Sequence, residues 1–530
     1  MAGKLYILVA LVVALLTTSE SAHILGVFPI PAKSHNIVFS ALTRELARRG
    51  HQVTVISPFR EKNPIPNLTE IEVKLDLTDD FSGNLFNLRH KGTLELSRSQ
   101  WKSAPAFCVS IFQHPQVQTF IHSKHHHFDA IIVETFANEC VLGFAHKFQA
   151  LIIQICQFGG THWMGDWLGN PNPYAYIPDA FLDYSSHMSF GERLVNTLTG
   201  VYWRTGQEFY SIPRQEAVMR QYFNDTDDIP PLADIVRNTS LLLLNNHFSL
   251  NYPRPLVPNM IEVGGMHVQT AKKLPEDLQI YLDEAPNGVI YFSMGSLLQG
   301  SQMPDSVRKA FVEAFSKLEQ KVLWKWETDS LPGQPNNVKL GKWLPQADIL
   351  GEVPVPCAAH PNVRLFITHG GLLSKQEAIN RGVPLLGIPV YGDQYLNVRK
   401  AESLGYGIRL EFDNITAESV LWAIQTALQP RYRENAQRLS RIYRDQPLTP
   451  LEQAAFWTEY VIRHKGAPHM RSAALDLTWY QYFLLDVIAV LALAVGVFLL
   501  LALLISRAIF RKLCGATPKD KNARHKKKIN

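Results

Sequence analysis

The sequence predicts an α/β protein with two doubly wound domains facing each other across a cleft, followed by one membrane-spanning helix. Short apolar runs alternate with amphipathic segments through most of the 530 residues, which predicts parallel sheets covered by helices. The alternation breaks at the Pro-rich stretch from Asn251 to Asn259 and then restarts, which predicts two domains. Residues 487–505 contain no charged side chain, which predicts the span.

The N-terminus has the layout of a cleaved secretory signal at residues 1–22. Lys4 precedes the apolar run from Leu5 to Leu16, and small residues follow that run. The alternative is an N-terminal anchor, but the apolar run is short for crossing a bilayer.

The first domain is expected at residues 23–255. A buried strand is predicted at His23 to Phe28, a helix at Asn36 to Arg49 and a second strand at Gln52 to Ser57. Further strands are predicted at Phe128 to Glu134 and Ala150 to Ile155.

The second domain is expected at residues 256–450. Its strands are predicted at Gly288 to Ser296 and Lys321 to Glu327, and again at Leu365 to Ile367. Gly370 and Gly371 then form a turn before a helix from Leu372 to Arg381. A helix N-terminus at a glycine turn offers unpaired N–H groups, so it favours a phosphate. Neither half carries a dinucleotide fingerprint or a Walker loop, which counts against dinucleotide oxidoreductases and P-loop proteins.

The membrane span is expected at residues 481–506 and a basic tail at 507–530. Aromatic residues precede the span and cations follow it, which indicates a cytosolic C-terminus. The tail carries nine Lys or Arg and one Asp, a charge of +8, so the rest of the +5 chain is near −3 and nucleic-acid binding has no support. Lys527 and Lys528 have the spacing of an endoplasmic reticulum retrieval signal, or alternatively only flank the span with positive charge.

The five cysteines do not form a recognisable disulfide framework. Cys140 and Cys156 lie in apolar surroundings, so buried free thiols are expected there. Cys108 and Cys357 would also be lumenal, and Cys514 cytosolic. Four glycosylation sequons agree with a lumenal face, at Asn67, Asn224, Asn238 and Asn414.

A long motif identifies a resemblance. The segment "FITHGGLLSKQEAINRGVPLLGIPVYGDQ" resembles the signature of the UDP-glycosyltransferases, and "KWLPQADIL" upstream matches its start. The likeness extends through "VGG", "FSMGS" and "FWTEYVIRHKGAPHMRSAALDLTWYQY" to the span, and it is greatest to insect members of the membrane-bound animal branch. It implies a GT-B fold of two Rossmann-like domains, with residues 451–480 packing back toward the first domain and the membrane.

The resemblance implies a donor site. Trp343 would stack on uracil, Gln346 would hydrogen-bond the nucleoside and Glu377 would accept the ribose hydroxyls. The diphosphate would be bound by His369, Gly370, Gly371 and Ser374, with Ser293 and Ser296 near the phosphates. The sugar hydroxyls would be bound by Asp393 and Gln394. Each residue taken alone also has an interpretation without a ligand: Trp343 could belong to the core, Glu377 could be a solvated helix position, and His369 could cap the helix.

The resemblance also implies a catalytic pair. His35, placed just before the helix at Asn36, would be the general base, although a helix-entry histidine without chemistry is the alternative. Family members pair this histidine with an Asp, where this chain has Glu134, one methylene longer, so the distance between the two is open. The implied reaction is an inverting single displacement.

Other features point away from a metal. The Asp-x-Asp spacing in Asp225 to Asp228 is interpreted as a solvated turn, and the histidine run from His122 to Phe128 as a surface feature. No cofactor or metal is expected, because the UDP-sugar is a co-substrate. The segment from Gly351 to Ala358 is extra relative to the family pattern and is predicted to bulge outward and leave the fold intact; the alternative is that it loosens the donor site.

The expected function is transfer of a hexose, with glucose favoured over glucuronate, from a UDP-sugar to a small lipophilic acceptor, as in detoxification. The enzyme would be a single-pass type I protein of the endoplasmic reticulum with lumenal domains, retrieval machinery as a partner and possible self-association. The alternatives are a catalytically weak member that binds UDP-sugar or lipophiles, and a nucleotide-sugar epimerase, which the signal and span disfavour. The acceptor pocket is expected around residues 101–120 and 163–203.

Overall fold

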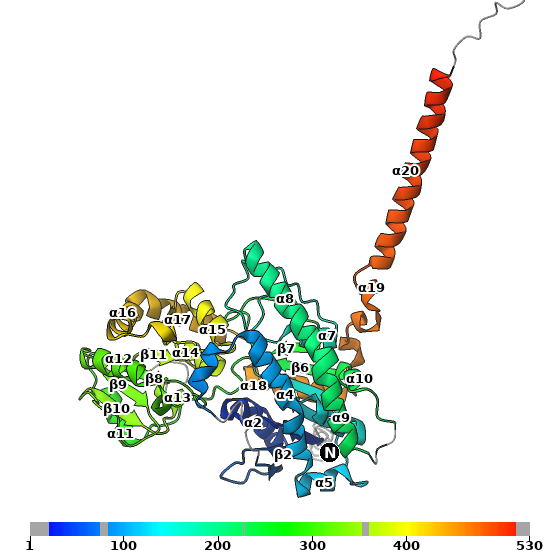
Figure 1. The fold of residues 1–530 in the computed structure, drawn as a ribbon. Coiled ribbons are helices and arrows are strands. Elements are labelled where there is room, and N and C mark those ends of the chain that lie inside the picture. The colour runs from blue at the N-terminus through cyan, green and yellow to red at the C-terminus, as the bar shows by residue number, and fades with distance from the viewer. Residues whose placement is uncertain (1–20, 75–82, 225, 227, 352–359, 516–530) are drawn as a thin grey trace, which may run out of the picture. The chain divides into compact units, whose positions relative to one another are not determined.

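The computed structural model describes residues 21–74, 83–224, 226, 228–351 and 360–515 (Figure 1). The chain divides into two compact units, Met1–Ser472 and Ala473–Asn530. The first unit holds two parallel β-sheets, and the second holds a long apolar helix. The predicted α/β class with two doubly wound, Rossmann-like domains is confirmed.

The first sheet has seven parallel strands in the order β3-β2-β1-β4-β5-β6-β7. Its central strands are apolar because helices cover both faces, and all five residues of β4 are buried. The strands are β1 (His23–Val27), β2 (Gln52–Ser57), β3 (Leu68–Glu72), β4 (Ala130–Glu134), β5 (Leu151–Cys156), β6 (Thr239–Leu244) and β7 (Met260–Glu262). The helices between them are α2 (Lys33–Arg48), α4 (Thr93–Phe112), α5 (Pro115–Ile121), α6 (Gly143–Phe148), α7 (His162–Leu168), α8 (Phe190–Gly206), α9 (Ile212–Tyr222) and α10 (Leu232–Arg237). β7 extends this sheet past residue 255, where the sequence placed the end of the first domain.

The second sheet has six parallel strands in the order β10-β9-β8-β11-β12-β13. The strands are β8 (Val289–Ser293), β9 (Lys321–Lys325), β10 (Val338–Gly341), β11 (Val363–Thr368), β12 (Leu385–Gly387) and β13 (Gly407–Arg409). The helices of this part are α11 (Glu276–Asp283), α12 (Asp305–Ser316), α13 (Gln346–Ile349), α14 (Leu372–Arg381), α15 (Gln394–Ser403), α16 (Ala417–Ala427) and α17 (Pro430–Arg444).

Strand order reverses once in each sheet, between β1 and β4 and between β8 and β11. At such a switch point the connections leave in opposite directions, so a crevice opens beyond the carboxyl ends of the two strands. In the second sheet the last residues of the two strands, Ser293 and Thr368, are register partners. We therefore expect ligands at the two switch points.

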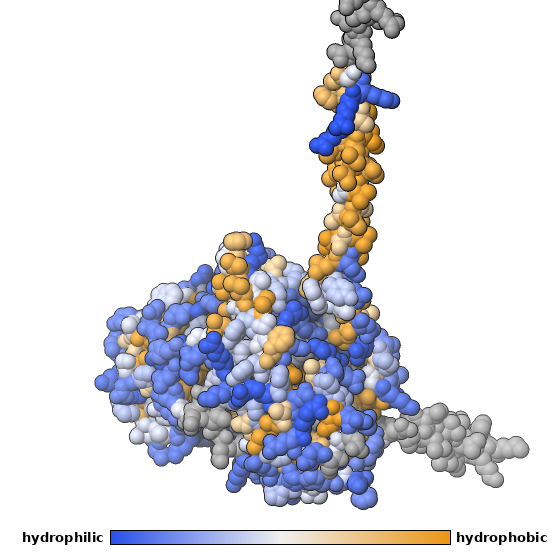
Figure 2. Space-filling view, turned by 45° about the vertical axis from the view of Figure 1, so that its right-hand side comes forward, coloured by the Kyte–Doolittle hydropathy of each residue, from blue (hydrophilic) through white to orange (hydrophobic). Residues whose placement is uncertain are grey.

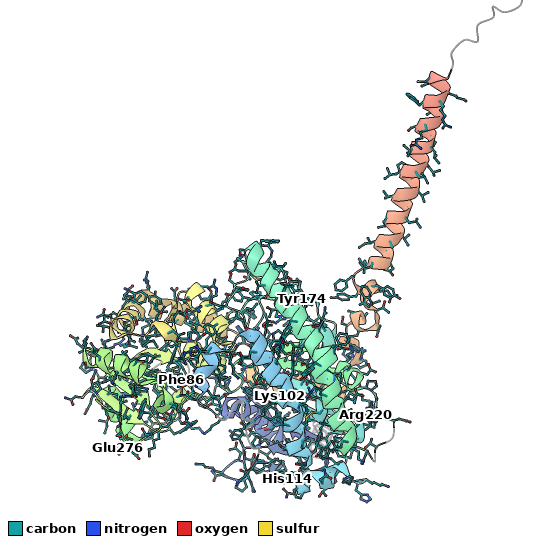
Figure 3. The ribbon with its side chains drawn as sticks, in the orientation of Figure 1. Phe86, Lys102, His114, Tyr174, Arg220 and Glu276 are labelled. Atoms are coloured by element: carbon teal, nitrogen blue, oxygen red, sulfur yellow. A yellow bond between two sulfur atoms is a disulfide. The ribbon has the colours of Figure 1, made fainter. Side chains whose placement is uncertain are left out.

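Two segments tie the sheets together. Phe86, in the short helix Leu85–His90 of the chain's first half, is buried in the core of the second sheet and packs 5.3 Å from Phe412 (Figure 3). In the other direction, α18 (Pro450–Arg463) returns to α2, where Glu459 pairs with Arg49 at 3.2 Å. Each sheet thus receives part of its packing from a distant part of the sequence.

Helix α2 begins at Lys33, earlier than the predicted start at Asn36. The backbone N–H of Asn36 donates to the carbonyl of Ala32 at 3.1 Å, so the three preceding residues already form the first turn. His35 therefore lies inside the helix and not just before it.

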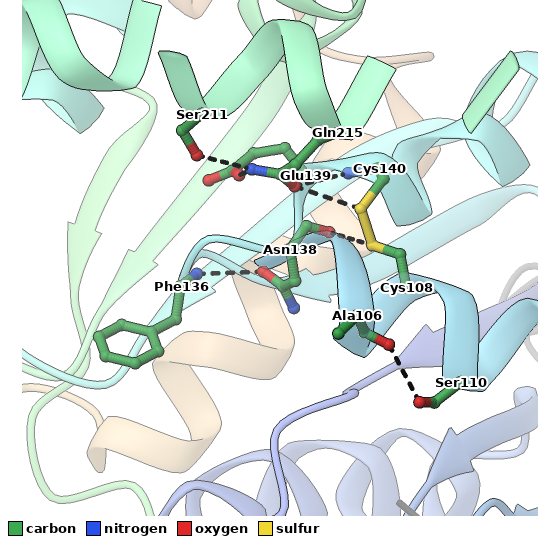
Figure 4. Close-up of a disulfide and its surroundings, with 9 residues drawn as sticks. All are labelled: Ala106, Cys108, Ser110, Phe136, Asn138, Glu139, Cys140, Ser211 and Gln215. Carbon is green, nitrogen blue, oxygen red and sulfur yellow. Dashed lines mark hydrogen bonds between the residues drawn. A yellow bond between two sulfur atoms is a disulfide. The ribbon is translucent and has the colours of Figure 1, made fainter. Parts of the chain in front are cut away.

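The expectation that Cys140 is a free thiol is wrong, because Cys140 and Cys108 form a disulfide with a Cα–Cα distance of 6.3 Å (Figure 4). The bond joins α4 to the turn after β4, two segments that only the tertiary fold makes neighbours. Gln215 accepts the backbone N–H of Cys140 at 3.1 Å and donates to buried Glu139 at 2.6 Å. Cys156 is buried and free, as predicted.

The second unit contains α19 (Trp479–Tyr482) and α20 (Leu485–Cys514). Among the described residues, α20 is the one helix long and apolar enough to cross a membrane. Its side chains are exposed and form the apolar column seen in Figure 2. The first unit also exposes apolar side chains along α8, among them Phe190 and Leu198, while the opposite side of that helix buries Asn196 and Thr199.

Candidate active site

The switch point of the first sheet brings His35 and Glu134 together. His35 lies in the first turn of α2, which follows β1, and Glu134 is the last residue of the neighbouring strand β4. Nδ1 of His35 lies 2.6 Å from Oε1 of Glu134. The glutamate therefore reaches the imidazole in spite of its extra methylene.

The pair is asymmetric in its exposure. The Glu134 side chain is fully buried while that of His35 is 18% exposed. Burial raises the pKa of Glu134, and the hydrogen bond and charge of His35 oppose that rise. With Nδ1–H donating to the carboxylate, the lone pair of Nε2 is available to a substrate. Phe136 packs edge-on against the imidazole at 5.5 Å.

The switch point of the second sheet holds His369, directly after β11. A Cβ on Gly295 would lie 2.5 Å from His369 Cε1, and one on Gly371 would lie 2.5 Å from Nε2, so the ring fits between two glycines. Burial, and then the charge of Lys325, lower the pKa of His369 to about 4. The imidazole is therefore neutral near pH 7, and a neutral imidazole carries one N–H that can donate a hydrogen bond.

The start of α14 forms the rest of this corner. Gly370 has a φ of 83°, which suits glycine, and Gly371 is the N-cap without a side-chain cap. The first N–H groups of the helix thus remain open to an anion. Across from them, Ser293 Oγ accepts the N–H of Gly295 at 3.3 Å, and Ser296 is partly exposed in the same loop.

A polar network connects α13 and α14. Nε2 of Gln346 donates to Glu377 Oε2 at 2.6 Å and to Ser374 Oγ at 3.1 Å. Ser374 and Glu377 lie three residues apart on α14 and therefore share a face. Burial raises the pKa of Glu377 to about 7, although Gln346 opposes this. The fold thus gathers three of the residues predicted to bind nucleoside and phosphate.

Trp343 is 58% exposed, which rules out the alternative of a core tryptophan. One face of its ring carries the ammonium of Lys33, whose Nζ lies 3.5 Å from the ring centroid. The contact joins the first turn of α2 to the loop before α13.

Asp393 and Gln394 lie at the start of α15. The amide oxygen of Gln394 accepts the N–H groups of Val390 and Tyr391 at 2.8 and 3.2 Å, so its NH₂ remains for a ligand. Asp393 Oδ2 accepts from Asn397 at 2.8 Å. Burial raises the pKa of Asp393, and Asn397, Lys375 and His35 oppose that rise. Asp393 also lines a small pocket whose other walls include Phe158, Arg254 and Leu372.

The sequence reasoning missed Lys375 and Asn397. The buried Nζ of Lys375 donates to Asn397 Oδ1 at 2.9 Å and to the carbonyl of Leu250 at 3.2 Å. Burial lowers the pKa of Lys375 to about 7. The chain from Lys375 through Asn397 to Asp393 fixes the carboxylate. The signal in the sequence that could have revealed Lys375 is its position among buried residues of α14, the helix after the glycine turn.

The described residues contain no group of three or more His, Cys, Asp or Glu arranged to hold a metal ion. In the histidine run, His126 contacts Ser123 and His127 contacts Asp129; both histidines are exposed and their partners are half-buried. Asp225 and Asp227 of the acidic turn lie outside the described residues, as does nearly all of the segment from Gly351 to Ala358.

Comparison with known sequences decides the family. The model of the family described as "UDP-glucoronosyl and UDP-glucosyl transferase" matches residues 24–520. The chain belongs to the UDP-glycosyltransferase family. It is 41% identical to UDP-glycosyltransferase UGT5 of Dactylopius coccus, over 90% of each chain. It is 31% identical to UDP-glucuronosyltransferase 1A8 of Homo sapiens, over 98% of each chain.

Solved structures agree on the fold of this UDP-glycosyltransferase. A UDP-glucosyltransferase from Polygonum tinctorium superposes with a TM-score of 0.54 at 16% identity, covering 84% of this chain and all of its own. The calicheamicin glycosyltransferase CalG4 gives 0.51 at 16% identity, covering 84% of this chain and 99% of its own. These likenesses establish the GT-B arrangement. The enzyme transfers a sugar from a UDP-sugar to an acceptor.

The sequons of the transferase lie on its surface. The four asparagines are all exposed, at Asn67, Asn224, Asn238 and Asn414. The predicted signal at residues 1–22 lies almost wholly, and Lys527 and Lys528 lie entirely, outside the described residues.

Proposed function

We propose that this transferase moves glucose from UDP-glucose to a hydroxyl of a small lipophilic acceptor, inverting the anomeric carbon and requiring no metal. The observation that carries the proposal is the 2.6 Å contact between Nδ1 of His35 and buried Glu134. An imidazole oriented by a carboxylate presents its other nitrogen as a general base. The charge of His35 also lowers the pKa of Asp393, which supports placing the base and the group proposed for the sugar hydroxyls in one site.

The reaction is a single displacement. Nε2 of His35 takes the proton of the acceptor hydroxyl while that oxygen forms a bond to the anomeric carbon. The bond from this carbon to the β-phosphate oxygen breaks, and UDP leaves with the electron pair. Attack from the face opposite the leaving group inverts the configuration, and Glu134 stabilises the imidazolium.

The leaving group gains negative charge as the bond breaks. Neutral His369 and the open N–H groups at the start of α14 would donate to the diphosphate. Lys325, whose charge already acts on His369, adds positive potential. These groups supply the charge stabilisation that a metal ion provides in metal-dependent transferases.

The choice of glucose is supported by a relative. The chain is 37% identical to UDP-glucosyltransferase 2 of Dactylopius coccus over 97% of its length, against 31% for the human glucuronosyltransferase. A lipophilic acceptor is supported by aromatic rings beside the base. Phe136 contacts His35 and packs against Phe158 at 5.7 Å, and Phe158 packs against Phe181 at 5.9 Å.

We also propose a location in the endoplasmic reticulum membrane, with α20 as a type I span and the two sheets in the lumen. Aromatic residues precede α20 and cations end it, as at the two interfaces of a bilayer. Sensitivity of the four sequons to a high-mannose endoglycosidase, with the tail open to protease in sealed microsomes, would support this topology. Unglycosylated protein with a protected tail would contradict it.

The test of the function uses the full chain in detergent. UDP release is measured from UDP-glucose and from UDP-glucuronate with a panel of phenols and lipophilic alcohols, and NMR reads the anomeric configuration of the product. His35→Ala should abolish transfer while UDP still binds, and exposed His127→Ala should change neither. A product with the retained α configuration would overturn the single-displacement mechanism. UDP binding without any turnover by wild type would favour the alternative of a non-catalytic binding protein.

A further inference from the structure

Lys33 is the first residue of α2, two positions before His35. Its Nζ lies 3.5 Å from the ring centroid of Trp343. Trp343 belongs to the half of the chain that forms the second sheet. Under the proposed donor site, uracil would stack on the ring of Trp343. A side chain of the acceptor half therefore covers one face of the nucleoside platform of the donor half.

The position is unfavourable for a cation. A lysine at the first turn of a helix faces the positive end of the helix dipole, and the first turn of α2 contains no acidic residue. Within the described ranges, no carboxylate lies within ion-pair distance of Lys33 Nζ. The contact with the Trp343 ring is therefore the interaction of this charge that the structure describes.

The surroundings of Lys33 are also positive. Burial, and then the charges of Lys62 and Lys325, lower its pKa. Lys325 ends β9, pairs with Glu327 at 2.7 Å and lowers the pKa of His369. Lys325 thus acts electrostatically on both Lys33, beside the nucleoside platform, and His369, in the diphosphate corner. A phosphate-bearing ligand would relieve the repulsion.

We propose that Lys33 is a donor-responsive clamp. In the free enzyme its ammonium covers Trp343. When a UDP-sugar binds, uracil takes the ring face and the ammonium moves to the diphosphate, forming an ion pair between the two halves of the enzyme. Because Lys33 and His35 both lie in the first turn of α2, this ion pair fixes the end of the helix that carries the base. The inference rests on the proposed donor site and adds to it the group that couples donor binding to the base.

Binding of two ligands separates this role from a merely structural one. Dissociation constants of UDP and of uridine are measured by tryptophan fluorescence on the full chain in detergent at fixed ionic strength. Lys33→Met should weaken UDP about tenfold or more, the effect of one lost charge-assisted contact. Uridine should bind as well as to wild type or more tightly, because the ring face is open. Lys33→Arg, which keeps the charge, should bind UDP about as well as wild type. Lys62→Met, which removes a nearby exposed cation, should weaken UDP binding less than Lys33→Met does.

Equal weakening of UDP and uridine by Lys33→Met would overturn the proposal, because it would mean that Lys33 only holds Trp343 in place. Unchanged UDP binding would overturn it as well. A Trp343→Ala variant provides the reference for a lost platform. If wild type bound neither ligand, the donor site itself would be wrong; if wild type bound both and Lys33→Met matched it, only the clamp would fail.

Discussion

Nδ1 of His35 and Oε1 of Glu134 lie 2.6 Å apart, although 99 positions separate the two residues in the sequence. The contact exists because β1 and β4 are neighbours at the point where strand order reverses. Glu134 at the end of its strand therefore meets the first turn of the helix that follows the other strand.

Substitutions at Glu134 should lower turnover in a graded way. Glu134→Gln removes the charge that stabilises the imidazolium and should reduce kcat by about 10²- to 10⁴-fold. Glu134→Asp shortens the side chain by one methylene, which withdraws the carboxylate from His35, and should reduce kcat by about 10- to 100-fold. Steady-state kinetics at saturating UDP-sugar check this, with UDP affinity as the control because neither change touches the donor half. An aspartate variant as active as wild type would show that the distance is not limiting.

UDP affinity should depend on pH through Glu377. Its pKa of about 7 means that the carboxylate is substantially protonated below neutrality and then accepts ribose hydroxyls poorly. UDP binding should therefore weaken by up to about tenfold per pH unit below pH 7. Calorimetric titrations between pH 5 and 8 check this. Glu377→Gln should bind UDP weakly with a flat profile, and a wild-type profile equally flat would contradict the assignment.

The same group should influence folding stability. The pKa of Glu377 is raised above that of an exposed glutamate, so the native state holds a proton that the unfolded state releases. The stability contributed in this way is fully present below about pH 4.5 and is lost as the pH rises through about 7. Glu377→Gln, which is permanently neutral, should match wild type at pH 5 and exceed it at pH 8 in denaturant unfolding. If the variant and wild type were equally stable at pH 5 and again at pH 8, the raised pKa of Glu377 would be wrong.

Gly371 should be intolerant of a side chain. A Cβ there would lie 2.5 Å from Nε2 of His369, so Gly371→Ala should displace the ring. The overpacking costs about 1–3 kcal/mol, and UDP binding should weaken correspondingly. Gly191→Ala is the matched control, because a Cβ at that exposed position meets nothing within 4 Å. Equal UDP affinity in the two variants would argue against a role for His369 in donor binding.

The disulfide should contribute to stability. Cys108 and Cys140 are 32 positions apart, and closing a loop of that length removes unfolded-state entropy worth about 3–4 kcal/mol. The double variant Cys108→Ala, Cys140→Ser should lose about this much in denaturant unfolding, while exposed Cys514→Ser should lose nothing. Mass spectrometry without reductant should detect the linked peptide, and two free thiols would disprove the bond.

Much of the donor corner could be predicted because it is local. A buried strand, a glycine turn and an amphipathic helix place His369, Ser374 and Glu377 by backbone geometry alone, since residues three or four apart on a helix share a face. The start of α2 lies three residues before the predicted one, because Lys33 and Ser34 carry no strong helix signal, while the backbone places them in a turn with a hydrogen bond from Asn36 to Ala32.

The sequence by itself determined the fold class, the family and the apolar span, because strand and helix periodicity, a long motif and a run of uncharged residues are properties of neighbouring positions. The tertiary structure alone decided the reach of Glu134 to His35, the pairing of Cys108 with Cys140, the contact of Lys33 with Trp343 and the burial of Phe86 in the second core. Each of these joins segments that are distant in the chain, and strand order and helix packing, which bring them together, are not written in any local pattern.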